Sequence, residues 1–558
     1  MTDTNISRRN FLGATGLGAG LLAMGALAGC APKQSDTLSD TGSDSNSAAE
    51  GAASIHSWEQ PLEPITDFVA EEDYEIVVIG AGIAGCAAAQ SAAEAGANVL
   101  LVEKFEGVTA HGQDNAALGS KLQIEKGYEY NKGEAARLVY DWSQSQANWY
   151  LIKTFVENSA DVLNHYIDMA PAYGLEVVLN DQMTARSDWY ELEERFRQLR
   201  YTAHNFINPE KEEPFPNINL VTMLCEDAQK NGATVKFNTK AEQLVKEGDK
   251  VVGVVVSDDE GYKRMNASKG VILATGGISC NPDMVNAWCP LAAKADNISY
   301  FPEGGASGDG IVMGMQIGAA RSRCYPAPLV HPVQLSVMGP GFDTCWLYVN
   351  NDGMRFCCEM AYEPTVTNAR MNSVNNVTWA VWDSHYPEHV QKQEPHKSQP
   401  WMATLEDDVE AAVANEEFVK ADTLDELAEK IGVPADNLKA TVARYNGMCA
   451  AGVDDDFGVP ERFLSSVEDG PFYACRVNAW TLAIPYGLHV DTESRVCTDE
   501  DEPIEGLYAV GNVQGDFFAN SYPVAVPGIS HGRALTFGRL IGQNLANGTT
   551  LDAYQYGK

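Results

Sequence analysis

Three glycines and one acidic residue form the arrangement in this sequence best suited to chemistry on a nucleotide. Gly80, Gly82 and Gly85 follow one apolar run, and Glu103 ends the next. Glycines at this spacing allow a tight turn, the approach of backbone N–H groups to a pyrophosphate and close packing of a helix on a strand. An acid about 20 residues further on accepts a hydrogen bond from a ribose hydroxyl. The arrangement predicts a bound dinucleotide, whereas the glycines alone would also fit an ordinary turn in an α/β domain.

Two strands and a helix must hold these residues in place. Residues 76–79 and 98–102 are short apolar runs that predict parallel strands, and the Ala-rich stretch between them predicts the connecting helix. The first turn of that helix would face the phosphates. Further strands of the same sheet are predicted at residues 234–237, 250–256, 270–277 and 506–512, with helices at 308–317 and in a last segment that ends near Leu545.

Several of these segments extend the nucleotide site into a flavin site. Residues 104–120 form a Gly-, Asn- and Ser-bearing loop that would run along a flavin, and residues 270–277 end in small residues that let the backbone approach a ligand. The N-terminal amides of the last helix would face the N1/O2 edge of the flavin. The residues predicted to bind the cofactor are Gly80, Gly82, Ile83, Ala84, Gly85, Glu103, Lys104, Asn115, Ala116, Ala241, Ala274, Thr275, Gly276, Gly308, Asp309, Gly511, Asn512, Gly528 and Ile529.

The composition disfavours several classes of partner and site. The 558 residues include 77 acidic and 39 basic side chains, which gives a formal net charge of −38. Such a surface repels nucleic acid, so no nucleic-acid partner is expected. The 12 cysteines include no CxxC pair, so the sequence indicates no metal site and no iron–sulfur cluster. The adjacent Cys357 and Cys358 are most simply core thiols, with a redox pair as the alternative.

The first 30 residues carry an export signature. Arg8 and Arg9 precede an apolar run that is too short to span a bilayer, and small residues lead to Cys30. The segment resembles a twin-arginine signal with a lipoprotein cleavage site. That resemblance implies export after folding and a lipid on Cys30 that anchors the protein outside the cytoplasm, on the cell membrane. An uncleaved anchor is the alternative. Residues 31–70 are expected to form a disordered tether, because few large apolar residues occur there.

The motifs after residue 72 resemble those of one family. GAGIAG at residues 80–85, ATGG at 274–277, SGDG at 307–310, GLYAVGN at 506–512 and TFGR at 536–539 follow one another as in the flavoprotein subunits of the fumarate reductase and succinate dehydrogenase superfamily. The resemblance implies an α/β fold: a Rossmann-like FAD-binding domain of the GR2 type with an inserted α+β capping domain. It also implies FAD. Although His111 lies in the loop where some members attach FAD covalently, noncovalent FAD is favoured.

The resemblance also divides the chain into domains. The His331-Pro332 pair would open the cap, and a GxRFxxE motif at residues 353–359 would lie inside it. Two helices separated by a turn at Gly432 are predicted from Thr423 onward. A cap of this kind can exclude water from the reaction. The predicted boundaries are 1–30 for the signal, 31–70 for the tether, 72–330 and 481–558 for the two parts of the FAD-binding domain, and 331–480 for the cap.

Three positions depart from the fumarate reductases that the chain resembles. Glu363 stands where those enzymes have a proton-donating Arg, Ala483 where they have a His, and Ala525 where they have a substrate-binding Arg. A buried dicarboxylate without these arginines would be an unpaired dianion, which is strongly unfavourable. Fumarate and succinate are therefore disfavoured, and an uncharged or weakly charged enone, aryl-acrylate or steroid-like acceptor is favoured.

Tyrosines near the expected flavin edge supply candidate catalytic groups. A tyrosine can donate a proton or polarise a carbonyl without an anionic partner. Tyr522 is the first choice, because it precedes Pro523 in an irregular segment before the last helix. The C-terminal pattern around it is also similar to that of 3-ketosteroid dehydrogenases. The candidates for catalysis are Tyr522, His331, Tyr486, Tyr348 and Arg355.

These features predict an exported FAD-dependent oxidoreductase that reduces an activated C=C bond in a small organic electron acceptor. Hydride would pass from the flavin to the β-carbon, and a tyrosine or His331 would protonate the α-carbon or bind the carbonyl. The sequence carries no haem motif, so a separate protein with FMN or haem is expected to supply the electrons. Two alternatives are a desaturating dehydrogenase of the 3-ketosteroid type and a lipoprotein that binds a flavin or ligand without turnover.

Overall fold

The computed structural model describes most of the chain from residue 56 onward. The last part of the predicted tether, residues 56–70, is therefore described: Trp58 is buried in a short helix (Ser57–Glu59), and β1 already begins at Ala70. The predicted signal with Cys30, the tether up to residue 55 and the side chain of His331 lie outside the described part. No helix within that part is both long enough and apolar enough to cross a bilayer. The described residues are 56–180, 199, 201–213, 215–298, 300, 302–332, 344–360, 363–393, 404–477 and 479–551.

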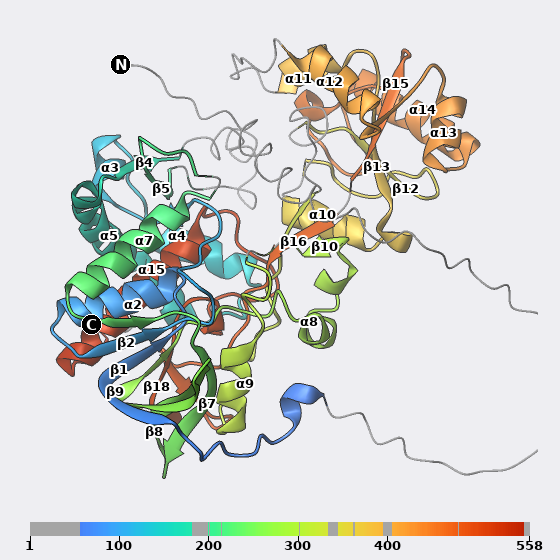
Figure 1. Ribbon diagram of the computed structural model, residues 1–558. Coiled ribbons are helices and arrows are strands. Elements are labelled where there is room, and N and C mark those ends of the chain that lie inside the picture. Colours follow the sequence, from blue (N-terminus) through green and yellow to red (C-terminus); the bar gives the residue numbers. More distant parts are fainter. Residues whose placement is uncertain are drawn as a thin grey trace, which may run out of the picture. The chain divides into compact units, whose positions relative to one another are not determined.

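An eight-stranded sheet forms the core of the nucleotide-binding region (Figure 1). Its strands run in the order β17-β18-β8-β9-β1-β2-β6, and β7 pairs with β8. The pairs β1–β2, β1–β9, β2–β6 and β9–β18 are parallel. The pairs β7–β8, β8–β9 and β17–β18 are antiparallel. The strands are β1 (Ala70–Ile79), β2 (Val99–Val102), β6 (Thr234–Lys236), β7 (Lys240–Glu247), β8 (Lys250–Asp258), β9 (Gly261–Leu273), β17 (Arg495–Cys497) and β18 (Pro503–Ala509).

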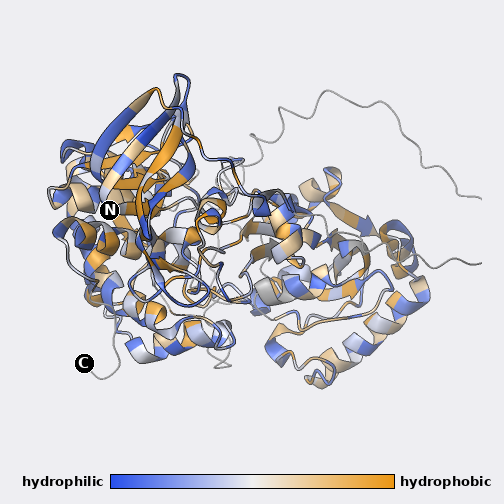
Figure 2. Ribbon diagram, turned by 90° about the horizontal axis from the view of Figure 1, so that it is seen from below, coloured by the Kyte–Doolittle hydropathy of each residue, from blue (hydrophilic) through white to orange (hydrophobic). Residues whose placement is uncertain are grey.

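The central strands are buried on both faces. All four residues of β2 and the last four of β1 are buried, as expected for parallel strands that carry helices above and below. Hydrophobic residues accordingly follow the inner strands in Figure 2. The α/β fold class with a parallel sheet is therefore confirmed, and the predicted strands after residue 230 do return to this sheet.

Three long helices pack together beside the sheet. Helix α2 (Ile83–Glu94) contacts both α7 (Asn217–Lys230) and α15 (Ile529–Asn547). The approach of α15 to α2 is close, because a Cβ atom at Gly538 would lie 2.4 Å from the carbonyl oxygen of Ala84. Glycine is therefore required at the crossing. Further helices in this region are α3 (Lys121–Glu125), α4 (Lys132–Trp142), α5 (Trp149–Met169), α8 (Pro282–Trp288) and α9 (Asp309–Gln316).

Two small sheets accompany the large one. In the first, β3 (Asn115–Ala116) and β4 (Glu176–Leu179) both pair with β5 (Ala203–Ile207). In the second, β10 (Asn297–Ile298) and β11 (Leu329–Pro332) both pair with β16 (Ala479–Ala483). Because β11 and β16 are antiparallel neighbours, the chain enters and leaves the predicted cap side by side.

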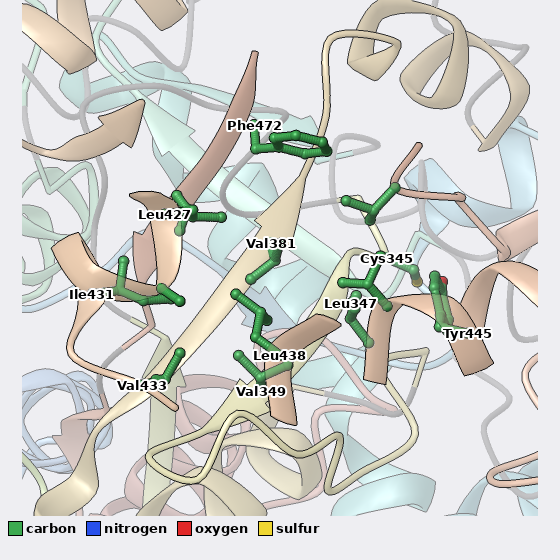
Figure 3. Packing of buried hydrophobic residues seen from close by; sticks show 14 of the residues in the cluster. Cys345, Leu347, Val349, Val381, Leu427, Ile431, Val433, Leu438, Tyr445 and Phe472 are labelled. Atoms are coloured by element: carbon green, nitrogen blue, oxygen red, sulfur yellow. The ribbon is translucent and has the colours of Figure 1, made fainter. Parts of the chain in front are cut away.

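The predicted cap contains a sheet of its own, in the order β12-β13-β15-β14. Leu427, Ile431, Leu438 and Tyr445 from two of its helices pack onto this sheet, as Figure 3 shows. The Thr423 hydroxyl accepts a hydrogen bond from the Glu426 N–H and so caps the first of these helices, as predicted. The elements are β12 (Leu347–Asn350), β13 (Thr378–Trp382), β14 (Phe418–Ala421), β15 (Phe472–Arg476), α10 (Glu363–Met371), α11 (Tyr386–Gln393), α12 (Leu405–Ala414), α13 (Leu424–Ile431) and α14 (Ala435–Ala451).

Candidate active site

One large pocket lies at the carboxyl ends of β1, β2 and β9. It encloses about 1340 Å³, part of it open to solvent. Open α/β sheets bind ligands at this edge, because the turns between strands and helices meet there. Fourteen residues predicted from the sequence line the pocket, namely Gly80, Gly82, Ile83, Ala84, Glu103, Lys104, Ala241, Ala274, Thr275, Gly276, Asp309, Gly511, Asn512 and Tyr522.

The three glycines of the first turn meet different requirements. Gly80 has φ +105° and its Cβ would lie 2.6 Å from the Ala274 carbonyl oxygen, so only glycine fits there. A Cβ at Gly85 would lie 1.8 Å from the carbonyl oxygen of Gly80. Gly82, in contrast, has φ −83°, and the nearest atom to its Cβ would be the Thr109 oxygen at 3.8 Å. The protein itself therefore does not require glycine at position 82, but a ligand against the backbone would.

Two charged side chains, Glu103 and Lys104, bond to groups around this turn. The Glu103 carboxylate accepts hydrogen bonds from the N–H groups of Ala81 and Phe105, at 2.7 and 3.1 Å. It therefore lies at the strand end where a ribose hydroxyl would reach it. Lys104 Nζ contacts Asp309 Oδ2 at 2.8 Å, which ties the loop after β2 to the N-terminus of α9.

Six predicted cofactor residues do not line the pocket but support its wall. The N–H of Ala116 donates to the carbonyl of Gly528 at 3.0 Å, and Gly528 has φ +80° with no room for a Cβ beside Asp114. This contact joins the loop after β2 to the start of α15. The side-chain amide of Asn115 donates to Asn217 at 2.7 Å in a buried position. The six residues are Gly85, Asn115, Ala116, Gly308, Gly528 and Ile529.

Tyr522 is the one predicted catalytic residue among the described lining of the pocket. Its hydroxyl oxygen accepts a hydrogen bond from the N–H of Ser530 at 3.2 Å, in the first turn of α15. Because the oxygen is the acceptor in that bond, the hydroxyl can still donate its proton to another group. Burial raises the pKa of Tyr522 to about 12, so this residue keeps its proton at neutral pH.

Two other predicted catalytic residues lie inside the cap, away from the pocket lining. Arg355 donates to Glu359 at 2.7–2.8 Å and to Asp454 at 2.8 Å, and all three side chains are almost completely buried. Its hydrogen-bonding capacity is therefore directed at two internal carboxylates. Tyr348 is buried in the core of the cap beneath Arg370, whose guanidinium lies 4.5 Å from the ring centroid. Packing explains both residues without a catalytic role.

Tyr486 does not line the pocket, and of His331 only the backbone is described. Tyr486 is buried and donates its hydroxyl to the carbonyl of Ser322 at 3.2 Å, and its ring lies 5.6 Å from that of Trp288. Its hydroxyl is thus engaged outside the pocket. The backbone of His331 lies in β11, next to Trp480 of β16.

Sequence reasoning did not single out two polar pocket residues, His531 and Ser530. Both lie in the first turn of α15, directly after the predicted Gly528 and Ile529. His531 Nδ1 lies 2.9 Å from the Asp114 carbonyl oxygen, and burial lowers the pKa of His531, so it is neutral at pH 7. Their position in the turn predicted to face the flavin was the available signal.

The three departures from fumarate reductases fall at distinct places. Ala483 lines the pocket together with Leu482, so an apolar surface stands at the position where the fumarate reductases have a histidine. Ala525 is completely buried and its carbonyl accepts a hydrogen bond from the Leu199 N–H. Glu363 begins α10. The described lining of the pocket contains no arginine.

Comparison with known proteins identifies the family. Residues 75–525 match the family described as the FAD binding domain. The chain belongs to this family. It is 27% identical over 506 residues to a vinyl phenol reductase of Lactiplantibacillus plantarum, a match that covers 86% of this chain and 97% of that protein. It is also 27% identical over 495 residues to a probable fumarate reductase of Shewanella frigidimarina, covering 85% of this chain and 75% of that protein.

A solved structure shows a similar fold. The 3-ketosteroid-Δ4-(5α)-dehydrogenase of Rhodococcus jostii matches with a TM-score of 0.65 at 22% identity, over 86% of this chain and 98% of that chain. The pocket fits FAD on its own geometry, because Gly82 leaves room against the backbone and Glu103 stands at the ribose position. The chain is therefore an FAD-dependent oxidoreductase of the fumarate reductase superfamily that acts on CH–CH bonds, as predicted.

Proposed function

We propose that this enzyme reduces the activated C=C bond of an uncharged or weakly charged acceptor, such as an enone, an aryl-acrylate or a steroid-like molecule. The observation that carries the proposal is the lining of the pocket, where Tyr522 stands together with the apolar Leu482 and Ala483. No arginine stands in the described lining to pair with a dicarboxylate. The similarity to a vinyl phenol reductase agrees with this, since vinyl phenol carries its C=C bond without a carboxylate.

In this proposal Tyr522 delivers the proton. The Ser530 N–H holds the Tyr522 oxygen, so the phenol proton is free to reach the α-carbon or the carbonyl of an acceptor. As a neutral imidazole, His531 adds no charge that would attract a carboxylate. Bound FAD supplies the hydride. A phenol with a pKa of about 12 is protonated at neutral pH, which is the state in which it can donate a proton.

Panel assays test this proposal. The purified protein is supplied with electrons from a reduced viologen dye, and the turnover of enones, acrylate esters, steroids and fumarate is compared. We expect turnover of at least one uncharged class and little or none of fumarate. Faster turnover of fumarate than of every uncharged acceptor would overturn the argument from the missing arginines. A reduced flavin that no acceptor reoxidises would instead support the alternative of a binding protein without turnover.

We further propose that the enzyme works outside the cytoplasm. The twin arginines Arg8 and Arg9 and the residues before Cys30 support export after folding and attachment to the membrane by a lipid. A separate protein with FMN or haem would then deliver the electrons. His111 lines the pocket, and its ring stacks at 5.1 Å from that of Phe215 and 5.7 Å from that of Tyr300; noncovalent attachment of FAD is part of this proposal. Release of all FAD on acid precipitation would test the noncovalent attachment.

A further inference from the structure

Arg533 is a buried cation that the proposed reaction does not use. It lies in the second turn of α15 and has no exposed surface. Its Nη2 donates to Asn512 Oδ1 at 2.8 Å, and its Nη1 donates to the carbonyl of Gln514 at 3.3 Å. The guanidinium carbon lies 4.6 Å from the ring centroid of Phe518 and 5.2 Å from that of Phe517. Two aromatic rings and two neutral oxygens therefore surround the charge.

This charge has no carboxylate partner among the described residues. The Nε atom of Arg533 is buried there without a hydrogen-bond partner. The nearby Tyr522 supplies no counter-charge at neutral pH, because it keeps its proton. Burial lowers the pKa of Arg533 to about 9, so the guanidinium is still charged at neutral pH. Removal of an unpaired cation from water is unfavourable. Ionisable groups whose pKa is strongly shifted by burial cluster at functional sites.

Arg539 shows that the same helix can supply a buried arginine with a counter-ion. It lies less than two turns after Arg533 and is also buried. Its Nη1 contacts Glu94 Oε2 at 2.9 Å and Gln90 Oε1 at 3.2 Å. The unpaired charge is therefore a property of position 533 rather than of α15 as a whole.

Arg533 reaches the pocket through its first hydrogen-bond partner. Asn512 and Ser530 both line the pocket, and Asn512 Oδ1 accepts from Ser530 Oγ at 3.1 Å as well as from Arg533. A guanidinium can only donate, so this pairing settles which way the amide of Asn512 points. The positive charge thus lies one side chain behind the pocket wall, beside the helix turn that was predicted to face the N1/O2 edge of the flavin.

We propose that Arg533 is the built-in counter-charge for reduction of the bound FAD and raises its reduction potential. Uptake of two electrons and one proton from an external reductant converts FAD to FADH⁻ and adds one negative charge to the isoalloxazine. A cation buried nearby stabilises that charge more strongly than a solvent-exposed one would, because the interior screens less. The proposal depends on FAD binding in this pocket and is independent of the identity of the acceptor.

Redox titration of the FAD-bound protein tests the proposal without any acceptor. Midpoint potentials are measured for wild type, Arg533→Gln, Arg533→Lys and the matched control Arg539→Gln, with xanthine oxidase as the reducing system and a reference dye. We expect a more negative potential in Arg533→Gln, substantial recovery in Arg533→Lys, which keeps the charge, and little change in Arg539→Gln. An unchanged potential in Arg533→Gln would overturn the proposal, and so would an equal loss in Arg533→Lys.

A measurement on the wild-type protein covers the case in which the variants do not hold FAD. The potential is followed from mildly acidic to mildly basic pH. The midpoint potential falls with pH half as steeply when reduction takes up one proton per two electrons as when it takes up two. We expect the smaller slope to persist into the acidic range, where free FAD already takes up two protons. A wild-type flavin that changes slope at the same pH as free FAD would contradict the assignment.

Discussion

The different requirements of Gly82 and Gly85 give the sharpest prediction about the cofactor. An alanine Cβ at position 82 would meet its nearest protein atom at 3.8 Å, whereas one at position 85 would lie 1.8 Å from a backbone oxygen. We therefore expect Gly82→Ala to fold and to lose affinity for FAD. Gly85→Ala, in contrast, must displace the turn itself.

The expected magnitudes separate the two variants. Alanine in place of glycine at the N-cap of α2 lowers the free energy of unfolding by about 1 kcal/mol. A hydrogen bond to a charged phosphate contributes about 1.5–3 kcal/mol, so each one lost at Gly82 weakens FAD binding about 10- to 100-fold. Overpacking at Gly85 destabilises the protein without ligand by about 3 kcal/mol or more.

Two measurements on protein stripped of FAD separate the effects. Thermal unfolding reports the stability of the protein alone, and quenching of FAD fluorescence reports the affinity. Gly107→Ala is the matched control, because its Cβ would meet nothing within 4 Å in the loop after β2. We expect Gly82→Val to bind more weakly than Gly82→Ala, with both melting close to wild type. Wild-type FAD affinity in Gly82→Val would refute the assignment of this turn to the pyrophosphate.

Three further predictions concern chemistry, stability and location. Tyr522→Phe should lower kcat by about 10²- to 10⁴-fold with FAD still bound; unchanged reoxidation of the reduced flavin would mean that Tyr522 only packs. Arg355→Met should lower the free energy of unfolding by about 3–5 kcal/mol, since two buried carboxylates lose their partner; denaturant unfolding measures this. Replacing Arg8 and Arg9 by lysine should leave FAD-loaded precursor in the cytoplasm, and Cys30→Ala should release active enzyme from the membrane; fractionation that finds either protein where wild type is found contradicts the proposed signal.

The nucleotide-binding turn could be predicted from the sequence because local constraints determine it. Gly85 lies against the Gly80 carbonyl, and the Glu103 carboxylate accepts from the N–H of Ala81. These contacts fall within a single βαβ unit, so the spacing of the residues already specifies the geometry. Helix α13 was predicted for the same reason. It begins after Thr423, whose hydroxyl accepts a hydrogen bond from the Glu426 N–H, three residues away.

The catalytic set could be predicted only in part, because long-range packing decides which side chains reach the pocket. Tyr348 was expected near the flavin edge and Arg355 lies in the GxRFxxE motif, yet the former packs in the core of the cap and the latter bonds to Asp454, a partner 99 residues away. His531 lies in a turn that was predicted to face the flavin, but whether its side chain reaches the pocket depends on the contact of Gly528 with Ala116 of β3. Sequence spacing does not encode such contacts.

A matched pair of acceptors tests the central claim most directly. Fumarate and its dimethyl ester share one activated C=C bond and differ in charge. The reduced enzyme is mixed anaerobically with each, and reoxidation of the bound flavin is followed in a stopped-flow instrument, with free reduced FAD as the control. A pocket without arginine in its described lining should give fast reoxidation by the ester and slow or no reoxidation by fumarate. Faster reoxidation by fumarate would contradict the account.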